Sequence, residues 1–103
     1  MNASIERVKV EILLDAPLCD LVTRMVEEAG AGGYTILVAL GGSGRNGRWR
    51  EDRVTGADTK LLLLTVAADD IAEAIVRGLE PLLDSYRLIV MTTRVGVVRG
   101  DKF

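Results

Sequence analysis

The sequence of 103 residues contains no histidine, and this absence excludes much of the chemistry that enzymes use. Without imidazole the chain cannot build a Ser/His or Cys/His nucleophile pair, an imidazole general base or a histidine-containing metal site. No hydroxyl group has a recognisable base beside it, and no acidic pair is placed for general acid/base work. We therefore expect no catalytic residue and no enzyme activity.

Cysteine and aromatic residues are also scarce. The single cysteine, Cys19, excludes an internal disulfide and a four-cysteine zinc site, and we interpret it as a small packing residue. Aromatic residues make up 4% of the chain, too few for the stacking platforms of RNA-binding sheets. The formal net charge of −2 gives no general attraction to nucleic acid. We expect no metal, no prosthetic group and no nucleic acid partner.

Long apolar runs are missing too. The two longest, residues 34–40 and 61–68, fall short of the ~18 residues that a membrane-spanning helix needs, and we expect a cytoplasmic protein. Apolar residues nevertheless make up 49% of this short chain, and its mean hydropathy is +0.24. A domain of this size buries only about 60 to 70% of its unfolded surface, so we expect exposed apolar surface and self-association.

The order of apolar patterns predicts a β-α-β, long loop, β-α-β chain. Period-two alternation or short β-branched runs predict strands over residues 8–14, 34–40, 60–67 and 87–95. Helical spacing predicts one helix from Asp15 to Ala29 and a second one that begins at a capping box formed by Asp70 and Glu73. This order predicts a single α+β domain over residues 1–103, a ferredoxin-like βαββαβ sheet with both helices on one face.

Residues 41–58 read as a structureless loop of about eighteen residues, a length that is usually functional or disordered. It opens with an amide-rich segment suited to anions, and guanidinium groups follow: Gly42, Ser43, Gly44, Arg45 and Asn46, then Arg48, Arg50 and Arg53. The only tryptophan, Trp49, lies among them, and we interpret Arg48, Trp49, Arg50 and Arg53 as a partner contact. The alternatives are a solvated hairpin tip, and a tryptophan that packs the loop onto its own sheet or a neighbouring subunit.

Cations also gather on and after the last strand, at Arg94, Arg99 and Lys102. Exposed strand charges usually protect a sheet edge from pairing. A second interpretation is that this tail approaches the glycine-rich loop, within the chain or across an interface, and closes a phosphate pocket.

Several of these segments together resemble the PII signalling proteins, and most of all the PII-like branch associated with bicarbonate transport and carboxysomes. The resemblance rests on GAGGYTILVALGGSGRNGR, on a DD-x-x-E helix start and on the closing VVRGDKF, and it spans nearly the whole chain. It implies a homotrimer with adenine nucleotides in the clefts between subunits and a T-loop, approximately residues 42–58, that changes conformation with the ligand. A bicarbonate transporter or a carboxysome-related protein is the implied candidate partner.

The resemblance also assigns residues. It implies nucleotide contacts for Gly33, Tyr34 and Thr35, for the loop entry from Gly42 to Asn46, and for Arg99. The chain lacks the glycine- and lysine-containing loop before the last strand and has Val97 in place of a second arginine. These losses favour ADP, AMP or cyclic AMP over ATP with 2-oxoglutarate, with bicarbonate as a candidate second ligand.

Two other functions of the same fold are alternatives. One is a structural or metal-tolerance trimer that uses the loop only for assembly. The other is a small acylphosphatase that would use Arg45 and Asn46, although adjacent residues on a flexible loop are poorly placed for that reaction.

Overall fold

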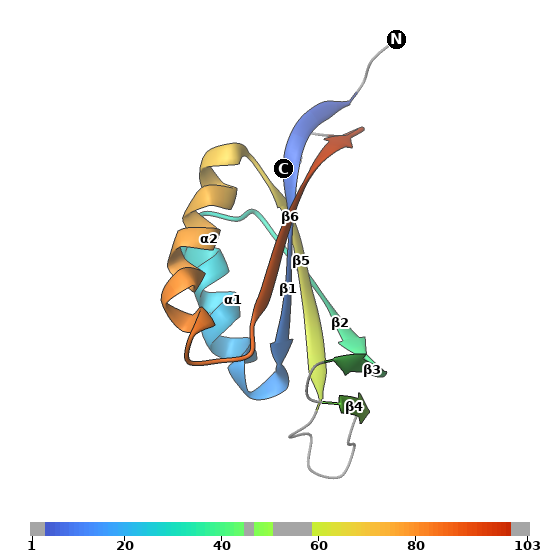
Figure 1. The fold of residues 1–103 in the computed structure, drawn as a ribbon. Helices are drawn as coiled ribbons and strands as arrows, with labels where there is room; N and C mark the ends of the chain where they lie inside the picture. The colour runs from blue at the N-terminus through green and yellow to red at the C-terminus, as the bar shows by residue number, and fades with distance from the viewer. Residues whose placement is uncertain (1–3, 45–46, 51–58, 100–103) are drawn as a thin grey trace.

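The computed structural model describes residues 4–44, 47–50 and 59–99. Its elements, in chain order, are β1 (Ile5–Asp15), a 3-10 turn η1 (Ala16–Leu18), α1 (Cys19–Glu28), β2 (Thr35–Ala39), β3 (Gly41–Gly44), β4 (Gly47–Arg50), β5 (Lys60–Ala67), α2 (Asp69–Leu83) and β6 (Ile89–Val97). Four strands form one antiparallel sheet in the order β2-β5-β1-β6, and both helices cover the same face of it (Figure 1). The ferredoxin-like α+β prediction is confirmed.

The core lies between the helices and one face of the sheet. Residues directly opposite each other on paired strands share a face, so the register of β1 against its two neighbours defines the buried rows. One such row runs from Leu63 through Ile12 to Val90, and Val22, Val26, Ile75 and Leu79 pack onto the sheet from the helices. Val10, Ile12 and Leu63 are each 0% exposed, as expected for a sheet face that two amphipathic helices cover.

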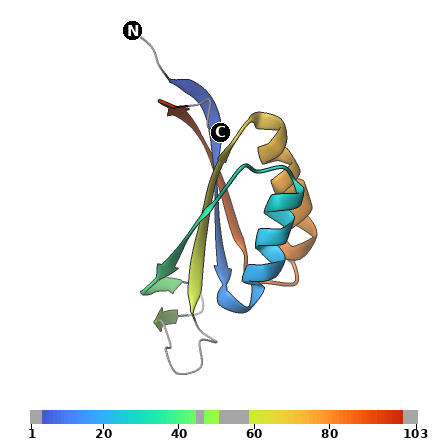
Figure 2. The same ribbon diagram turned by 180° about the vertical axis from the view of Figure 1, so that it is seen from behind.

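The other face of the sheet carries no helix, as the view from behind also makes clear (Figure 2). An apolar row crosses all four strands on this face, because Leu37 pairs with Leu62, Leu62 with Leu13 and Leu13 with Ile89. Leu37 is 50% exposed, Ile89 51% and the neighbouring Met91 45%. Part of the predicted surplus of apolar surface therefore lies on this open sheet face.

Two oppositely charged pairs lie on the open face. Lys60 lies at the start of β5 and donates to the Asp15 carboxylate at 2.5 Å, while Lys9 lies 3.7 Å from Glu11. Opposite charges in contact leave little net field around the apolar row. The open face is thus apolar and locally neutral, which suits contact with another protein surface.

The predicted element boundaries hold for β5 and shift elsewhere. The first helix does not begin at Asp15, because a separate 3-10 turn containing Pro17 precedes α1. The predicted capping box is wrong: α2 begins at Asp69 after Ala68, and the structure gives that cap no side-chain hydrogen bond. Glu73 instead accepts a bond from Arg77, one turn later at 2.5 Å. The last strand begins two residues later than predicted, at Ile89, and the residue before it, Leu88, belongs to the buried core.

Residues 41–58 are not structureless throughout, which corrects the prediction for this segment. Gly41–Gly44 and Gly47–Arg50 pair as an antiparallel hairpin, with Gly44 opposite Gly47. Gly47, the first residue of β4, has φ 101°, a left-handed conformation that glycine adopts without steric cost. The hairpin lies at the end of the sheet where β2 finishes (Figure 1).

Candidate functional site

The first predicted group, Gly33, Tyr34 and Thr35, lies where the chain passes from α1 into β2. The helix ends in a Schellman motif: Ala31 N–H donates to Val26 O, Gly30 N–H donates to Glu27 O, and Gly30 has φ 103°. After this turn the chain runs to Thr35, which pairs with Leu64 on β5. The Thr65 hydroxyl donates to Gly33 O at 2.5 Å and holds the segment against the sheet.

The backbone around Gly33 is open on its outer side. A Cβ atom placed on Gly32 or Gly33 would meet nothing within 4 Å, and neither glycine has the positive φ that forces the residue type. Nothing within the described part of one chain therefore requires glycine here. The space next to Gly33 is available to a ligand or to another subunit, and Tyr34 beside it is 38% exposed.

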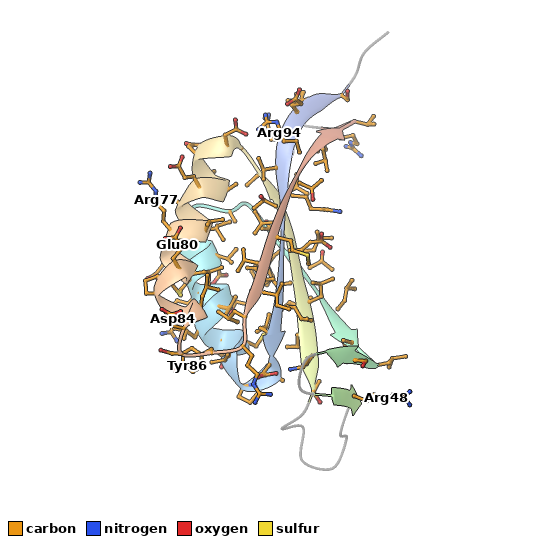
Figure 3. The ribbon with its side chains drawn as sticks, in the orientation of Figure 1. Arg48, Arg77, Glu80, Asp84, Tyr86 and Arg94 are labelled. Carbon is orange, nitrogen blue, oxygen red and sulfur yellow. The ribbon has the colours of Figure 1, made fainter. Side chains whose placement is uncertain are left out.

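The second predicted group is the loop entry. Gly42, Ser43 and Gly44 lie in β3 and are exposed, and Ser43 pairs with the exposed Arg48 on β4. Figure 3 shows Arg48 at the outer end of this hairpin, away from the helices. Arg45, Asn46 and Arg53 lie outside the described residues, as do the side chains of Trp49 and Arg50.

The third predicted group follows the last strand. Arg99 is exposed beyond the end of β6, and Lys102 lies outside the described residues. Arg94, further back on this edge strand, is bound by two carboxylates: its Nε is 2.9 Å from Glu6 and its guanidinium 3.2 Å from Asp69. These bonds, first to Glu6 and then to Asp69, raise the pKa of Arg94 above its ordinary value. The sequence offered no way to foresee that Arg94 links β1, β6 and the start of α2.

The three groups do not meet within one chain. Gly33 precedes β2 and the loop entry follows it, and a five-residue strand at about 3.3 Å per residue separates them by about 15 Å or more. The end of β6 lies at the opposite end of the sheet from the hairpin (Figures 1 and 2). The described end of the tail, at Arg99, therefore lies away from the described loop entry of its own chain, residues 42–44.

Two residues that the structure brings into view were missed at the sequence level. Thr65 is buried at 2% exposure, and its only signal was a polar residue at an inward position of an apolar strand. Asp15 pairs with Lys60 across the foot of the sheet, a contact that depends on strand register. Among the described residues no group of three or more His, Cys, Asp or Glu could hold a metal ion. Among them, too, no helix is long and apolar enough to cross a bilayer.

Comparison with known proteins gives one family. The family model described as "Nitrogen regulatory protein P-II" matches residues 7–102. No curated protein sequence matches the chain.

Solved structures extend this comparison. CPII from Thiomonas intermedia K12, a nitrogen regulatory PII-like protein bound to ADP, AMP and bicarbonate, is 23% identical with a TM-score of 0.88, over 97% of this chain and 95% of that one. A PII-like signalling protein from Thermus thermophilus is 28% identical with a TM-score of 0.83, over 100% and 99%. The B. subtilis GlnK–ATP complex is 14% identical with a TM-score of 0.52, over 92% and 84%. The fold of this chain is the fold of these proteins.

Proposed function

Because the chain belongs to the nitrogen regulatory protein P-II family, we propose that it is a homotrimer that binds ADP or AMP between its subunits and reports this through its T-loop. Members of the family are non-enzymatic signalling proteins, and this chain is a PII-like signalling protein. The observation that supports ADP or AMP as the ligand is the similarity to CPII, whose structure contains ADP, AMP and bicarbonate. We place the protein in the cytoplasm as a single domain over residues 1–103.

The open sheet face supports the trimer. An apolar row crosses this face, and no described residue of one chain forms a layer over it: Leu37, Leu62, Leu13 and Ile89. Burying apolar area contributes about 25 cal/mol per Å², so the hydrophobic effect favours an assembly that brings three such faces together. The charges of this face are already paired within one chain, as Lys9–Glu11 and Asp15–Lys60, so burying them in an interface would leave no unpaired charge among these four groups.

The separation of the three predicted groups supports a site between subunits. One subunit would supply Gly33, Tyr34 and Thr35, and a neighbour would supply the loop entry Gly42, Ser43, Gly44, Arg45 and Asn46, with Arg99 as a further phosphate contact. Glycines with open space beside them let a ligand approach the backbone, and guanidinium groups bind phosphate through paired N–H donors. Bicarbonate is the proposed second ligand, since a small anion needs only a few such donors.

The output is a conformation of the T-loop. A ligand shifts a loop equilibrium only by the difference between its affinities for the two loop states, so the nucleotide must contact one state better. Arg48, Trp49, Arg50 and Arg53 would then contact the partner. A bicarbonate transporter or a carboxysome-related protein is our candidate partner, and carboxylates on its surface would be the matching groups for the arginines.

The test is a binding panel. Thermal shift and calorimetry with ATP, ADP, AMP and cyclic AMP, each with and without bicarbonate, should give a raised melting temperature with ADP or AMP. Arg45→Ala should weaken ADP binding by about 1.5 to 3 kcal/mol, roughly 10- to 150-fold, if it removes a charged hydrogen bond. Arg77→Ala is the matched control, because Arg77 pairs with Glu73 on the outer surface of α2.

Two results would contradict the proposal. An unchanged ADP affinity in Arg45→Ala would remove Arg45 from the site. A stable trimer that responds to no adenine nucleotide would instead favour a structural or metal-tolerance trimer.

A further inference from the structure

The core holds one polar side chain that the proposed function does not explain. Among the residues that the structure describes, Thr65 is the only buried polar side chain, at 2% exposure. It lies on β5 directly opposite Val10, which is 0% exposed, and it faces the helices. A hydroxyl in such surroundings costs free energy unless it is hydrogen-bonded, and this one donates to Gly33 O at 2.5 Å.

The acceptor belongs to a segment that has little else to fix it. Gly32 and Gly33 have no side chains to pack, and a Cβ atom on either would meet nothing within 4 Å. On one side the segment is held by the Schellman motif at Gly30, and on the other by the pairing of Thr35 with Leu64. The Thr65 hydroxyl holds the carbonyl between these two anchors, one residue along β5 from Leu64.

We propose that Thr65 is a positioning residue for the nucleotide site: its hydroxyl fixes the Gly33 backbone in the conformation that binds ligand. This inference rests on the proposed function, since Gly33 is the residue that meets the nucleotide. A segment fixed before binding loses less conformational entropy when the ligand arrives than one the ligand must order itself. Thr65 does not contact the ligand; it acts through the carbonyl of Gly33.

Two substitutions separate the hydroxyl from the shape of the side chain. Thr65→Val keeps the volume and removes the donor, so the core stays filled while the Gly33 carbonyl turns to water. Thr65→Ser keeps the donor and removes a buried methyl group, so the core is weakened while the hydrogen bond stays. Thr92→Val is the matched control, because Thr92 lies opposite Val10 on the same face, is exposed and belongs to the edge strand β6.

The experiment measures ADP affinity by calorimetry for the wild type and the three variants, together with the melting temperature of each. Amide hydrogen exchange of residues 31–34 is followed without ligand. We expect ADP binding about three- to ten-fold weaker in Thr65→Val, the effect of one lost hydrogen bond, with faster exchange at residues 31–34. Thr65→Ser should bind ADP within about two-fold of the wild type despite a lower melting temperature, and Thr92→Val should match the wild type.

The pattern across variants decides the outcome. A purely structural role would make ADP affinity follow the melting temperature, with Thr65→Ser worse than Thr65→Val, and this result would overturn the inference. Equal affinity and equal exchange in Thr65→Val and the wild type would overturn it as well. Absence of ADP binding by the wild type itself would overturn the proposed function, and the inference with it, and is visible before any variant is compared.

Discussion

Two glycines of the segment between α1 and β2 should respond to the same substitution in opposite ways. Gly30 has φ 103°, a conformation that L side chains rarely adopt, whereas Gly33 has no positive φ and open space where a Cβ atom would lie. Gly30→Ala should destabilise the fold by about 1 to 2 kcal/mol, because the helix end requires the left-handed conformation. Gly33→Ala should stabilise it by about 0.4 to 1 kcal/mol, because alanine reduces the entropy of the unfolded chain.

The affinity for ADP should be lowered by Gly33→Ala and left unchanged by Gly30→Ala, the reverse of their effects on stability. If ADP closes over Gly33, the added methyl group meets the ligand, and such overpacking costs about 1 to 3 kcal/mol, roughly 5- to 150-fold in affinity. Gly30→Ala should bind ADP as the wild type does, at a temperature well below its melting point. Calorimetry at low temperature and ligand-free thermal unfolding measure the two effects separately.

The prediction for ADP affinity and the prediction for stability can each be refuted separately. Gly33→Ala that binds ADP with wild-type affinity would refute the approach of a ligand to this backbone. Gly33→Ala that unfolds earlier than the wild type without ligand would refute the open space beside Gly33. Light scattering on the same samples verifies that the oligomeric state is unchanged, so that a loss of affinity reports the ligand contact.

The remaining predictions concern assembly and charge. Ile89→Glu should dissociate the proposed trimer, as measured by light scattering, because the substitution would bury an unpaired carboxylate at a cost of several kcal/mol per subunit. The control Ala74→Glu, at an exposed position on α2, should leave the oligomeric state unchanged. A trimeric Ile89→Glu protein would argue against the open face as the interface. Arg94→Gln should lower the melting temperature slightly, and less so in high salt. Because the pKa of Arg94 is raised in the folded state, its stabilising contribution is present below the ordinary arginine pKa and is lost only above the folded-state pKa. The decrease in melting temperature of Arg94→Gln should therefore be equal at pH 6 and pH 9.

How far the sequence predicted the fold depended on side-chain periodicity. The strand over residues 60–67 was predicted with the observed bounds, because apolar residues occupy both faces of it in a nearly continuous run. In the sheet it is an inner strand, between β2 and β1. β3 was missed because Gly41, Gly42 and Gly44 have no side chains, so no period-two signal exists to be seen. The capping box failed because Asp69, one residue earlier, already lies in the first turn of α2.

The candidate site was predictable as a set of residues and not as an arrangement. Local composition identified the glycine-rich entry and the arginines, because a segment rich in both without apolar periodicity indicates an exposed loop, where binding residues are common. The placement of Gly33 and Arg99 away from the loop entry follows from strand lengths and register, which no local pattern contains. Thr65 was invisible for the related reason that its role depends on a carbonyl 32 residues away.

The described hairpin also bears on how a small ligand could control the T-loop. A two-stranded hairpin is marginally stable in water, and this one pairs four residues with four, with little side-chain packing from its glycine-rich strand. A Cβ atom placed on Gly44 would meet nothing within 4 Å, so this end of the glycine-rich strand has open space beside it. Because only a small free energy would hold this segment in the hairpin, a ligand that makes one or two charged hydrogen bonds to another conformation would shift the population towards that conformation. The weakness of the glycine-rich strand would therefore let this loop report a ligand in the way proposed above.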